Sequence, residues 1–466
     1  MADLPVAETP RRLSTVTLRP ERFGAIAFNP FFAEEVQLDS MEGWIMSLFT
    51  GEYSWPSIER ATADRFNLPI DKARLTVWKT AEKLQRIGGL TREERPTKPQ
   101  VEAPPIPQFA EEGPALKAPK QAIWDVTYAC NLTCPHCLTA SGKAHPDELD
   151  TGGAKRVVDR LAEAQVLYLA LSGGEPLLRP DILDIIEYAT SQNLRVDVAT
   201  NGVVLTDRVR RGLRDLPIFQ VQVSIDGIGS THDRFRGRIG AFEAACTTVR
   251  TLRSEGIGVS LSTTATSENI DQLDELIDLA VSLGCRGYKA IPFIAAGRGR
   301  EHENQLRLTA DGLRRLGQTL VRRQQELLGI LAIATDGGFP FLWNSSKPSD
   351  AYDPSDDTMG CSAGYDTISI GADGTAYPCP FLETLPLGNV VTTPIQEIWA
   401  RAPVLHALRN LTKSAFDEPC RSCTYAPEMC HGGCRAAALL AHGSLVAPDP
   451  TCSRAAHHHH CLPVLQ

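Results

Sequence analysis

The sequence predicts an α/β protein in three parts: a small α+β domain, a parallel sheet of six strand–helix units that forms either a closed or an open barrel, and a cysteine-rich section. One observation behind this prediction is the alternation of short apolar runs with helical patterns through residues 120–309. That order is typical of a parallel sheet covered by helices. The other is the cysteine distribution: of 13 cysteines, none precedes Cys130 and eight lie between Cys361 and Cys461.

Residues 13–94 are expected to form the α+β domain. Asn29-Pro30 supplies a turn between two short strand candidates, Phe23–Phe28 and Glu35–Leu38. Three helices follow, with Asp71 as the expected N-cap of the last one and Gly88-Gly89 as its end: Met41–Phe49, Ser57–Asn67 and Lys72–Ile87. A module of this size is near the lower limit for folding alone.

A proline-rich stretch, residues 95–119, has neither helical nor strand periodicity and is predicted to be an extended linker. The barrel, residues 120–309, has six strand candidates: Ala122–Thr127, Leu167–Ser172, Arg195–Thr200, Gln220–Ile225, Gly258–Thr264 and Gly287–Ile291. In barrels of this kind, chemistry takes place at the carboxyl ends of the strands. A bridging helical region, residues 310–345, leads to the cysteine-rich section, residues 346–466.

The composition of the chain argues against two classes of protein, nucleic-acid binders and membrane proteins. Acidic residues outnumber basic ones by 56 to 47, a net charge of −9 that argues against a nucleic-acid binder. No run of 18 apolar residues is present, so no membrane span is expected. The N-terminus lacks an apolar stretch of signal-peptide length, which favours the cytoplasm. In a cytoplasmic chain, clustered cysteines indicate metal or redox chemistry.

Cys130-x3-Cys134-x2-Cys137 directly follows the first predicted strand. Three thiolates on one short loop can hold three irons of a 4Fe–4S cluster, which leaves the fourth iron open to chelate a small molecule. A zinc site with His136 as its fourth ligand, or three reduced thiols, are the alternatives. The spacing favours the cluster.

This spacing, after the first strand of a six-unit barrel, resembles the radical S-adenosylmethionine (radical SAM) superfamily. The resemblance covers residues 120–309 and implies the partial (β/α)6 barrel of that family. It also implies that the open iron binds the amino and carboxylate groups of S-adenosyl-L-methionine. An electron, supplied by a flavodoxin or ferredoxin-type donor, would then cleave the sulfonium and give a 5′-deoxyadenosyl radical.

Ser172-Gly173-Gly174-Glu175-Pro176 ends the second strand. Two glycines allow the backbone to approach a ligand closely, and Glu175 can accept hydrogen bonds from an ammonium group. Such turns are often only structural. Behind the cysteine triad, however, the motif matches the family's site for the methionine amino group.

Four further residues match family positions for the rest of the cofactor: His136, Ser224, Asp226 and Arg236. The resemblance implies that His136 lies against the adenine and that Arg236 meets the methionine carboxylate. Ser224 and Asp226 would face the ribose and methionine moieties. Asp226 could equally cap a turn, and Arg236 could be an ordinary surface arginine. Two other cysteines lie in apolar helical stretches and are expected in the core: Cys246 and Cys285.

The C-terminal cysteines form a second pattern: Cys361-x12-Gly374-x4-Cys379, then Cys420-x2-Cys423-x6-Cys430-x3-Cys434, then Cys452. Taken alone, the pattern would also suit two structural zinc sites. It resembles the SPASM domain of radical SAM enzymes that modify peptides, with one extra residue between Cys423 and Cys430. The resemblance implies two auxiliary 4Fe–4S clusters, and so three clusters in all.

The family's ligand order implies that one auxiliary cluster is held by Cys420, Cys423, Cys430 and Cys452. The other would be held by Cys361, Cys379 and Cys434, and its fourth iron would take a carboxylate, a water or a substrate group. The nearest acidic candidates are Asp353, Asp356 and Asp357. Cys461 and the preceding His457–His460 fall outside the pattern, and we expect a mobile terminus there rather than a metal-binding tail.

Thr17–Phe23, the hairpin and the helices after Met41 resemble the peptide-recognition element of ribosomal natural-product pathways, a small winged-helix-like domain. The resemblance implies that residues 13–94 bind the leader of a precursor peptide, by adding it as a strand to the hairpin beside the last helix. A DNA-binding winged helix is the alternative. Ser57–Asn67 is mixed in charge, however, and lacks the basic character of a recognition helix.

Together these features predict a radical SAM maturase that modifies a ribosomally made precursor peptide by a crosslink, a thioether, or an oxidation or decarboxylation. Trp124–Cys130 and Ser172–Pro176 resemble the mycofactocin-precursor maturases in particular, although those enzymes use a separate recognition protein. Two rival predictions stay open. One is a maturase of a folded protein, of the sulfatase-activating type; the other is a non-catalytic iron–sulfur regulator with a DNA-binding head.

Overall fold

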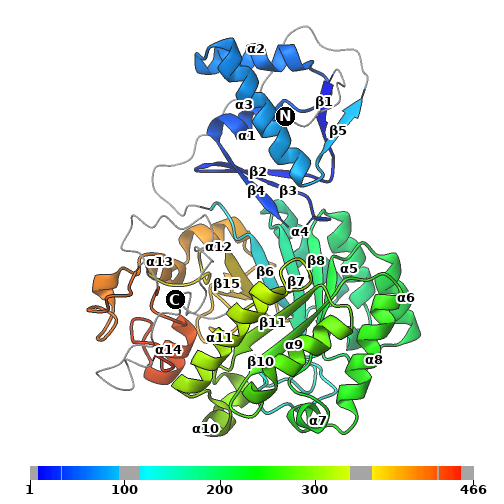
Figure 1. The fold of residues 1–466 in the computed structure, drawn as a ribbon, viewed down its shortest axis with the longest axis vertical. Coiled ribbons are helices and arrows are strands. Elements are labelled where there is room, and N and C mark those ends of the chain that lie inside the picture. Colours follow the sequence, from blue (N-terminus) through cyan, green and yellow to red (C-terminus); the bar gives the residue numbers. More distant parts are fainter. Residues whose placement is uncertain (1–8, 33, 94–115, 336–358, 428–429, 453–466) are drawn as a thin grey trace. The chain divides into compact units, whose positions relative to one another are not determined.

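The structure, a computed structural model, describes residues 9–32, 34–93, 116–335, 359–427 and 430–452 (Figure 1). The chain divides into two compact units, Met1–Lys117 and Ala118–Gln466. Some residues singled out in the sequence lie outside the described ranges: Asp353, Asp356, Asp357 and His457–Cys461. None of the helices in those ranges is long and apolar enough to cross a membrane.

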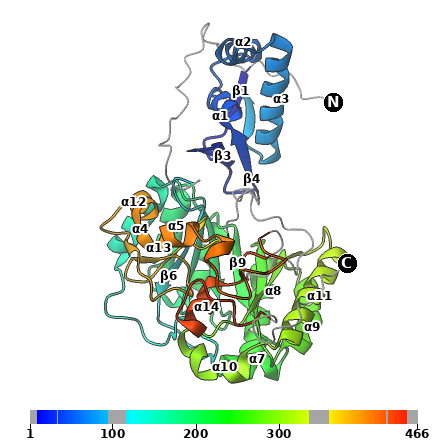
Figure 2. The ribbon, with the colours of Figure 1, turned by 90° about the vertical axis from the view of Figure 1, so that its left-hand side faces the viewer.

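In the N-terminal unit, a three-stranded antiparallel sheet packs against helices (Figure 2). The central strand is β3, and the three strands are β2 (Thr17–Glu21), β3 (Gly24–Phe28) and β4 (Glu35–Asp39). The helices are α1 (Ser40–Ser47), α2 (Trp55–Phe66) and α3 (Ile70–Arg86). Side chains from both layers, among them Leu38, Ile45 and Leu84, form one apolar core.

Three details of this unit differ from the sequence-based predictions. β2 was not predicted because it contains Arg19 and Glu21, yet the structure buries both side chains and pairs them at 2.5 Å. α3 begins at Ile70, so Asp71 lies in its first turn and the N-cap prediction is wrong. A further strand pair, β1 (Thr9–Arg12) with β5 (Leu90–Glu93), extends the unit to residues before the predicted boundary at residue 13.

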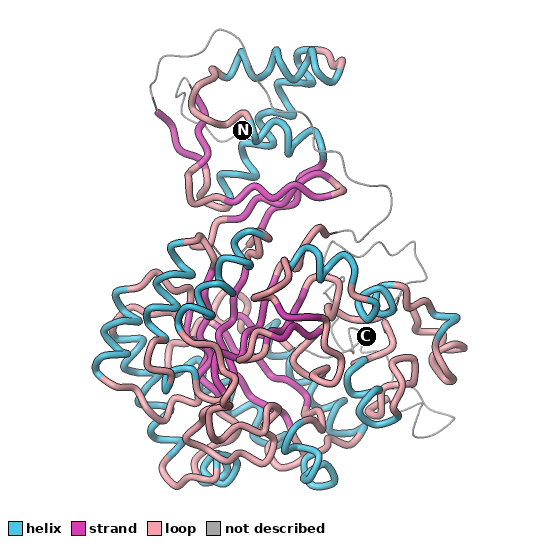
Figure 3. The backbone as a smooth tube through the Cα atoms, turned by 180° about the vertical axis from the view of Figure 1, so that it is seen from behind, coloured by secondary structure: helices cyan, strands magenta, loops and turns pink. Residues whose placement is uncertain are grey.

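The second unit is built on one ten-stranded sheet (Figure 3). Seven parallel strands follow in chain order: β6 (Gln121–Thr127), β7 (Tyr168–Gly173), β8 (Arg195–Thr200), β9 (Gln220–Ser224), β10 (Val259–Ala265), β11 (Gly287–Pro292) and β12 (Ala332–Ala334). The first six agree closely with the six predicted strands and confirm the partial barrel. The seventh was not predicted, because three residues carry no periodic signal.

Helices cover the outer face of the parallel strands: α4 (Thr151–Glu163), α5 (Ile182–Ser191), α6 (Asp207–Asp215), α8 (Ala241–Ser254), α9 (Leu273–Ser282) and α11 (Ala310–Glu326). Strand side chains alternate between this apolar layer and the barrel interior. In β8, for example, Val196 and Val198 are fully buried in the core, whereas the polar Asp197 points the other way. Cys246 and Cys285 lie in the same core, as predicted.

The cysteine-rich section continues the barrel sheet. β13 (Thr367–Ile370) pairs in parallel with β6, and β14 (Thr375–Tyr377) and β15 (Gly388–Asn389) follow in antiparallel order. Three helices accompany these strands: α12 (Ile395–Arg401), α13 (Pro403–Arg409) and α14 (Arg435–His442). Because β6 and β13 share a backbone ladder, the barrel and the cysteine-rich section form one folded body.

Candidate functional site

The cysteine triad lies on the loop that follows β6. Two hydrogen bonds close the base of this loop: Cys130 N donates to Gly142 O at 2.9 Å, and Gly142 N donates to Tyr128 O at 3.0 Å. Cys130 and Cys137 are partly exposed, Cys134 is buried, and all three are free thiols. The triad therefore stands at the carboxyl edge of the parallel strands, where the sequence predicted it.

Glu175 follows β7, and its side chain is almost fully buried. Its Oε1 accepts hydrogen bonds from Leu177 N at 3.1 Å and Thr200 Oγ1 at 2.8 Å, and its Oε2 accepts from Asn201 N at 2.7 Å. A carboxylate offers about four acceptor positions, so roughly one remains for a further donor. Burial raises the pKa of Glu175 to about 6, although these hydrogen bonds oppose the shift.

Gly173 and Gly174 bring the chain after β7 against the segment that precedes the triad. A side chain on Gly173, whose φ is +121°, would collide with Thr127 O, and one on Gly174 would collide with Ala129 O. The sequence suggested that these glycines admit a ligand. In the structure they admit the chain's own backbone, so that Glu175 N donates to Ala129 O at 2.8 Å and Glu175 is tied to the cysteine loop.

A buried network of polar side chains, with an ion pair between Asp226 and Arg236, joins the cysteine loop to the segment after β9. Asp226 Oδ2 lies 2.5 Å from Arg236 Nη2 and 3.4 Å from His136 Nε2, and none of the three side chains is more than 9% exposed. Arg236 Nη1 also lies 3.7 Å from Cys134 Sγ. Burial alone would raise the pKa of Asp226, but Arg236, the two neighbouring histidines and the Thr264 N–H together outweigh burial, so the pKa falls below its ordinary value. Burial lowers the pKa of His136 to about 4, so the ring is neutral at pH 7.

Asp226 has more partners than a turn cap would have. Its Oδ1 accepts from Thr264 N at 2.8 Å, and its own N–H donates to His232 Nδ1 at 3.0 Å. Arg236 is buried, which excludes the surface-arginine alternative. Ser224 ends β9 beside Ser262 of β10 and is half-buried. The contacts of these residues with S-adenosylmethionine stay predictions.

Sequence reasoning missed the roles of two residues near the triad. Asn201, directly after the third barrel strand, was given no role, yet its Nδ2 donates to Asn131 Oδ1 at 2.8 Å and lies 4.0 Å from Cys130 Sγ. Its place after a parallel strand was a usable signal, because such ends share one edge. Arg298 was missed entirely, since its partners, Cys134 O and Ser141 O, are backbone carbonyls that no sequence pattern marks.

The C-terminal cysteines gather into two groups. In one, burial and then the neighbouring thiols Cys361 and Cys434 raise the pKa of Cys379 well above its ordinary value. In the other, burial and the neighbouring thiols raise the pKa of Cys430 to about 12; these neighbours are Cys452, Cys420 and Cys423. The groups are the two sets that the resemblance implied, and their role as cluster ligands stays a prediction.

A buried cation interacts with both groups. The charge of Arg435 opposes the burial-driven rise in the pKa of Cys361 and of Cys420. Its guanidinium lies 4.6 Å from the Phe416 ring centroid, and it donates from Nη1 to Leu445 O at 2.7 Å. Thiolates that lie close together in apolar surroundings repel one another and are stabilised by positive charge nearby. Arg435 supplies one such charge, and bound iron would supply more.

No three His, Cys, Asp or Glu side chains within the described ranges are placed to share one metal ion. A 4Fe–4S cluster binds each thiolate at a different iron, so its ligands need not converge on one point. The free thiols, their grouping and the nearby arginines fit clusters in all three places.

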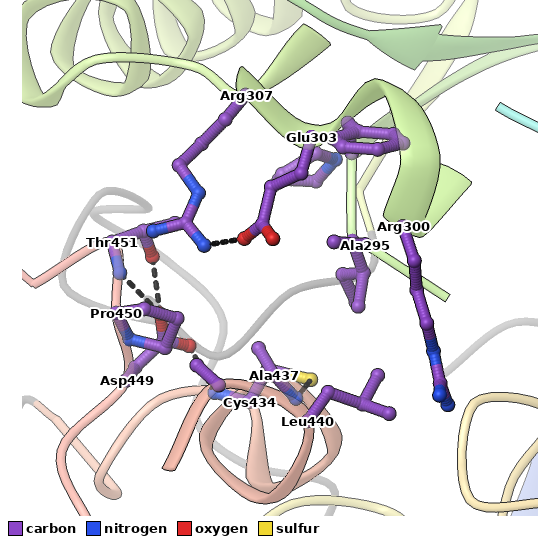
Figure 4. Close-up of a pocket in the computed structure, with 14 residues that line it drawn as sticks. Ala295, Arg300, Glu303, Arg307, Cys434, Ala437, Leu440, Asp449, Pro450 and Thr451 are labelled. Carbon is purple, nitrogen blue, oxygen red and sulfur yellow. Dashed lines mark hydrogen bonds and ion pairs between the residues drawn. The ribbon is translucent and has the colours of Figure 1, made fainter. Parts of the chain in front are cut away.

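A cavity of about 180 Å³ lies beside Cys434 (Figure 4). The segment after β11, together with α10 (Glu303–Leu306), forms one wall, and α14 with Asp449–Thr451 forms the other. Glu303 pairs with Arg307 across α10, and Asp449 accepts from Cys434 N at 2.6 Å. The cavity is smaller than the roughly 300–1,000 Å³ of typical small-molecule pockets.

Family profiles and related sequences match both the barrel and the cysteine-rich section. The profile of the Radical SAM superfamily matches residues 124–280, and that of SPASM, an iron–sulfur cluster-binding domain, matches residues 361–424. The chain is 33% identical to the AdoMet-dependent heme synthase of Methanosarcina barkeri over 345 residues, 72% of this chain and 96% of that one. It is 32% identical to the mycofactocin maturase MftC of Mycolicibacterium smegmatis over 354 residues, 75% of this chain and 86% of that one.

Among solved structures, Streptococcus suis SuiB bound to S-adenosylmethionine has a similar fold, with a TM-score of 0.67 at 17% identity. The match covers 95% of this chain and 100% of SuiB, so it extends beyond the barrel in both directions. The cysteine loop at the mouth of a partial barrel, the two cysteine groups behind it and these similarities agree: the chain belongs to the radical SAM superfamily and carries a C-terminal SPASM domain.

Proposed function

We propose that this radical SAM enzyme is a maturase of a ribosomally made precursor peptide. Its N-terminal unit binds the leader, and its barrel modifies the core. The observation that supports this most is the presence of the N-terminal unit and the radical SAM barrel in one chain. The similarity to SuiB covers 95% of this chain and so includes most of residues 9–93, and another SuiB structure is described as bound to the precursor peptide SuiA.

The edge of β4 suits strand addition by a leader peptide. β4 pairs with β3 on one side, and no other strand in the described ranges pairs with it. Asp39 at its end caps α1 by accepting from Glu42 N, and Glu42 pairs with Lys83 of α3 at 2.6 Å. An extended peptide along this edge would gain backbone hydrogen bonds from β4, and α3 is held close enough to add side-chain contacts.

S-adenosylmethionine and three 4Fe–4S clusters would supply the radical and electron chemistry when bound. The residues of the chain bind and orient: Glu175 keeps roughly one acceptor position for an ammonium group, and the neutral His136 offers an apolar ring face. The loop triad would hold the first cluster and the two C-terminal groups the others. A flavodoxin or ferredoxin-type protein in the cytoplasm would donate the electron.

A second candidate is a heme-synthase-like reaction, because that relative is 33% identical over nearly its whole length. The match covers 72% of this chain, however, so just over a quarter has no counterpart there, about the share that precedes Ala118. The solved structure of anSMEcpe likewise covers only 71% of this chain, with a TM-score of 0.55. The mycofactocin maturase match covers a similar share of this chain, 75%, so this share alone does not separate the two candidates. SuiB does, because its match covers 95% of this chain and one SuiB structure is described as bound to a precursor peptide.

The test compares the full chain with a chain that starts at Ala118, both reconstituted without oxygen. The ligand is the leader of a candidate precursor, taken from a short open reading frame found next to the gene, and binding is followed by fluorescence anisotropy. The full chain should bind the leader far more tightly, since the β4 edge is absent from the shorter chain. Both should form 5′-deoxyadenosine.

Equal leader affinity in the two chains would contradict the role of the N-terminal unit. Iron coproporphyrin serves as the competing substrate, because another relative is named Fe-coproporphyrin III synthase. If it stimulates 5′-deoxyadenosine formation and the precursor peptide does not, the heme-synthase-like candidate is correct. Tight binding of duplex DNA by the full chain, and not by the shorter one, would favour the regulator.

A further inference from the structure

We infer that Arg298 positions the loop that carries the cysteine triad, by clasping the backbone of that loop from the far side of the barrel mouth. Arg298 lies in the short helix η3 (Gly297–His302), which follows β11. The inference depends on the proposed assignment of the triad to a cluster and is independent of the peptide substrate.

Three hydrogen bonds form the clasp. Arg298 Nη1 donates to Cys134 O at 2.8 Å, Nη2 donates to Ser141 O at 2.7 Å, and the backbone N donates to Cys137 O at 3.0 Å. All three acceptors are carbonyls, and Arg298 pairs with no carboxylate in the part of the chain that the structure describes. Within the loop, Cys134 O and Cys137 O accept only long hydrogen bonds, from Cys137 N at 3.3 Å and Ala140 N at 3.4 Å. A carbonyl oxygen has two lone pairs, so Arg298 supplies a second and shorter hydrogen bond to each of them.

The two glycines beside Arg298 make this approach possible. Gly297 has a φ of +52°, and a side chain there would lie 2.6 Å from Cys137 O and collide with Leu138 O. A side chain on Gly299 would lie 2.9 Å from the Phe293 ring. The segment is therefore fitted between the loop on one side and Phe293 on the other, and a larger residue at either position would separate them.

The clasp joins parts of the barrel that the sheet does not join. Four strands separate β6 from β11 in the sheet, so no ladder connects the ends of these two strands. The guanidinium is a rigid planar fork. Because the guanidinium donates to Cys134 O and Ser141 O at the same time, it fixes the distance between the two turns on either side of Cys137. The loop is thus held in one arrangement before iron binds, which is a positioning role.

Lysine would not replace arginine here. Its ammonium is a point charge on a flexible stem and lacks the fork that reaches two carbonyls at once. Arg298→Lys should therefore keep the charge and lose the bridge. Gly297→Ala gives an independent perturbation, because it pushes the segment away from the loop and leaves the guanidinium intact.

The test compares the full-length wild type with Arg298→Ala, Arg298→Lys and Gly297→Ala. Arg211→Ala serves as the control, because Arg211 is an exposed arginine of α6. Each protein is reconstituted without oxygen, and iron and sulfide are counted per chain. Electron paramagnetic resonance of the reduced protein, with and without S-adenosylmethionine, then identifies the cluster that responds to the cofactor.

Arg298→Ala should weaken iron retention in that cluster alone, by about 10–100-fold in a chelator competition, as is typical when partners of metal ligands are removed. Arg298→Lys should show a smaller loss, Gly297→Ala a loss in the same direction, and Arg211→Ala none. The auxiliary clusters should keep their signals in every variant, which also reports that the unit is folded.

A variant with Cys130, Cys134 and Cys137 all changed to alanine defines the cofactor-responsive signal. If that signal disappears there while Arg298→Ala retains iron like the wild type, the clasp is refuted and the cluster assignment stands. If the triple variant keeps the signal, the assignment itself is wrong. If Arg298→Ala loses all three clusters, the comparison is made with Arg298→Lys instead. Loss of iron from the cofactor-responsive cluster alone in Arg298→Lys supports the clasp, and iron retention equal to that of the wild type overturns it.

Discussion

Glu175→Gln keeps the shape of the side chain and removes its charge, so it isolates what the carboxylate contributes to S-adenosylmethionine binding. The Oε2 atom accepts one hydrogen bond, from Asn201 N at 2.7 Å, and has roughly one acceptor position left for an ammonium group. A hydrogen bond to a charged group contributes about 1.5–3 kcal/mol. The dissociation constant for S-adenosylmethionine should therefore rise about 10- to 150-fold.

The same substitution should change how stability depends on pH. The pKa of Glu175 is about 6 in the folded chain against an ordinary value of 4.5, because burial disfavours the charge. The folded state therefore holds this proton more tightly, and the contribution to stability is present below pH 4.5 and lost as the pH rises through 6. It amounts to about 2 kcal/mol. Glutamine should remove this slope.

Glutamine also has a pH-independent cost. Its amide nitrogen must face the N–H of either Leu177 or Asn201, since both backbone donors need an acceptor. One unsatisfied buried donor costs about 1–3 kcal/mol. Calorimetry of S-adenosylmethionine binding to the reconstituted protein, and urea unfolding at pH 4.5 and 7, measure the two effects. Glu163→Gln, an exposed change in α4, is the control. An unchanged dissociation constant would refute the ammonium-binding role of Glu175.

Three further predictions concern buried charges. Asp226→Asn removes the main counter-charge of the buried Arg236 and should cost about 3–5 kcal/mol in urea unfolding, whereas a loss below 1 kcal/mol would mean that solvent reaches the pair. Asp125, on β6, has its pKa raised to about 7, chiefly by burial. Stability should therefore fall by about 3 kcal/mol as the pH rises from 4 to 7, and the slope should flatten in Asp125→Asn; an identical slope would contradict this. Arg435→Met should lower the amount of iron that both C-terminal cysteine groups hold, measured per chain after reconstitution. Arg401→Met, at an exposed position, is the control and should leave the iron content unchanged. Wild-type iron content in Arg435→Met would show that the cation is dispensable.

The barrel was predictable because its strands carry a local signal. In β8 and β9, apolar residues alternate with polar ones, and turns or helical patterns bound each run. β2 escaped because a buried ion pair, Arg19 with Glu21, gives it a polar sequence. The strands β13 to β15 escaped for another reason. They are two to four residues long, and what stabilises them is a partner far away in the chain.

The candidate site also has parts that the sequence predicts and parts that it does not. Cysteine spacing is local, so the triad and the two C-terminal groups were visible in the sequence. Contacts made through the backbone were not. The sequence predicts that Gly173 and Gly174 lie close to a ligand, and that stays a prediction; their close packing against Thr127 and Ala129 was not predicted. Arg298 donates to backbone carbonyls more than 150 positions earlier in the chain. Every residue has a carbonyl, so the residue types at those positions do not predict the contact.

The ladder between β6 and β13 has a consequence for how the chain is made. β6 leaves the ribosome about 240 residues before the strand that pairs with its outer edge. At 5–20 residues per second, the nascent barrel waits roughly 10–50 s with that edge open. An unpaired strand edge is a template for association with other chains. We therefore expect chaperones that cover exposed strand edges, or slower growth at low temperature, to raise the yield of folded protein, because both reduce association through this edge before β13 is made.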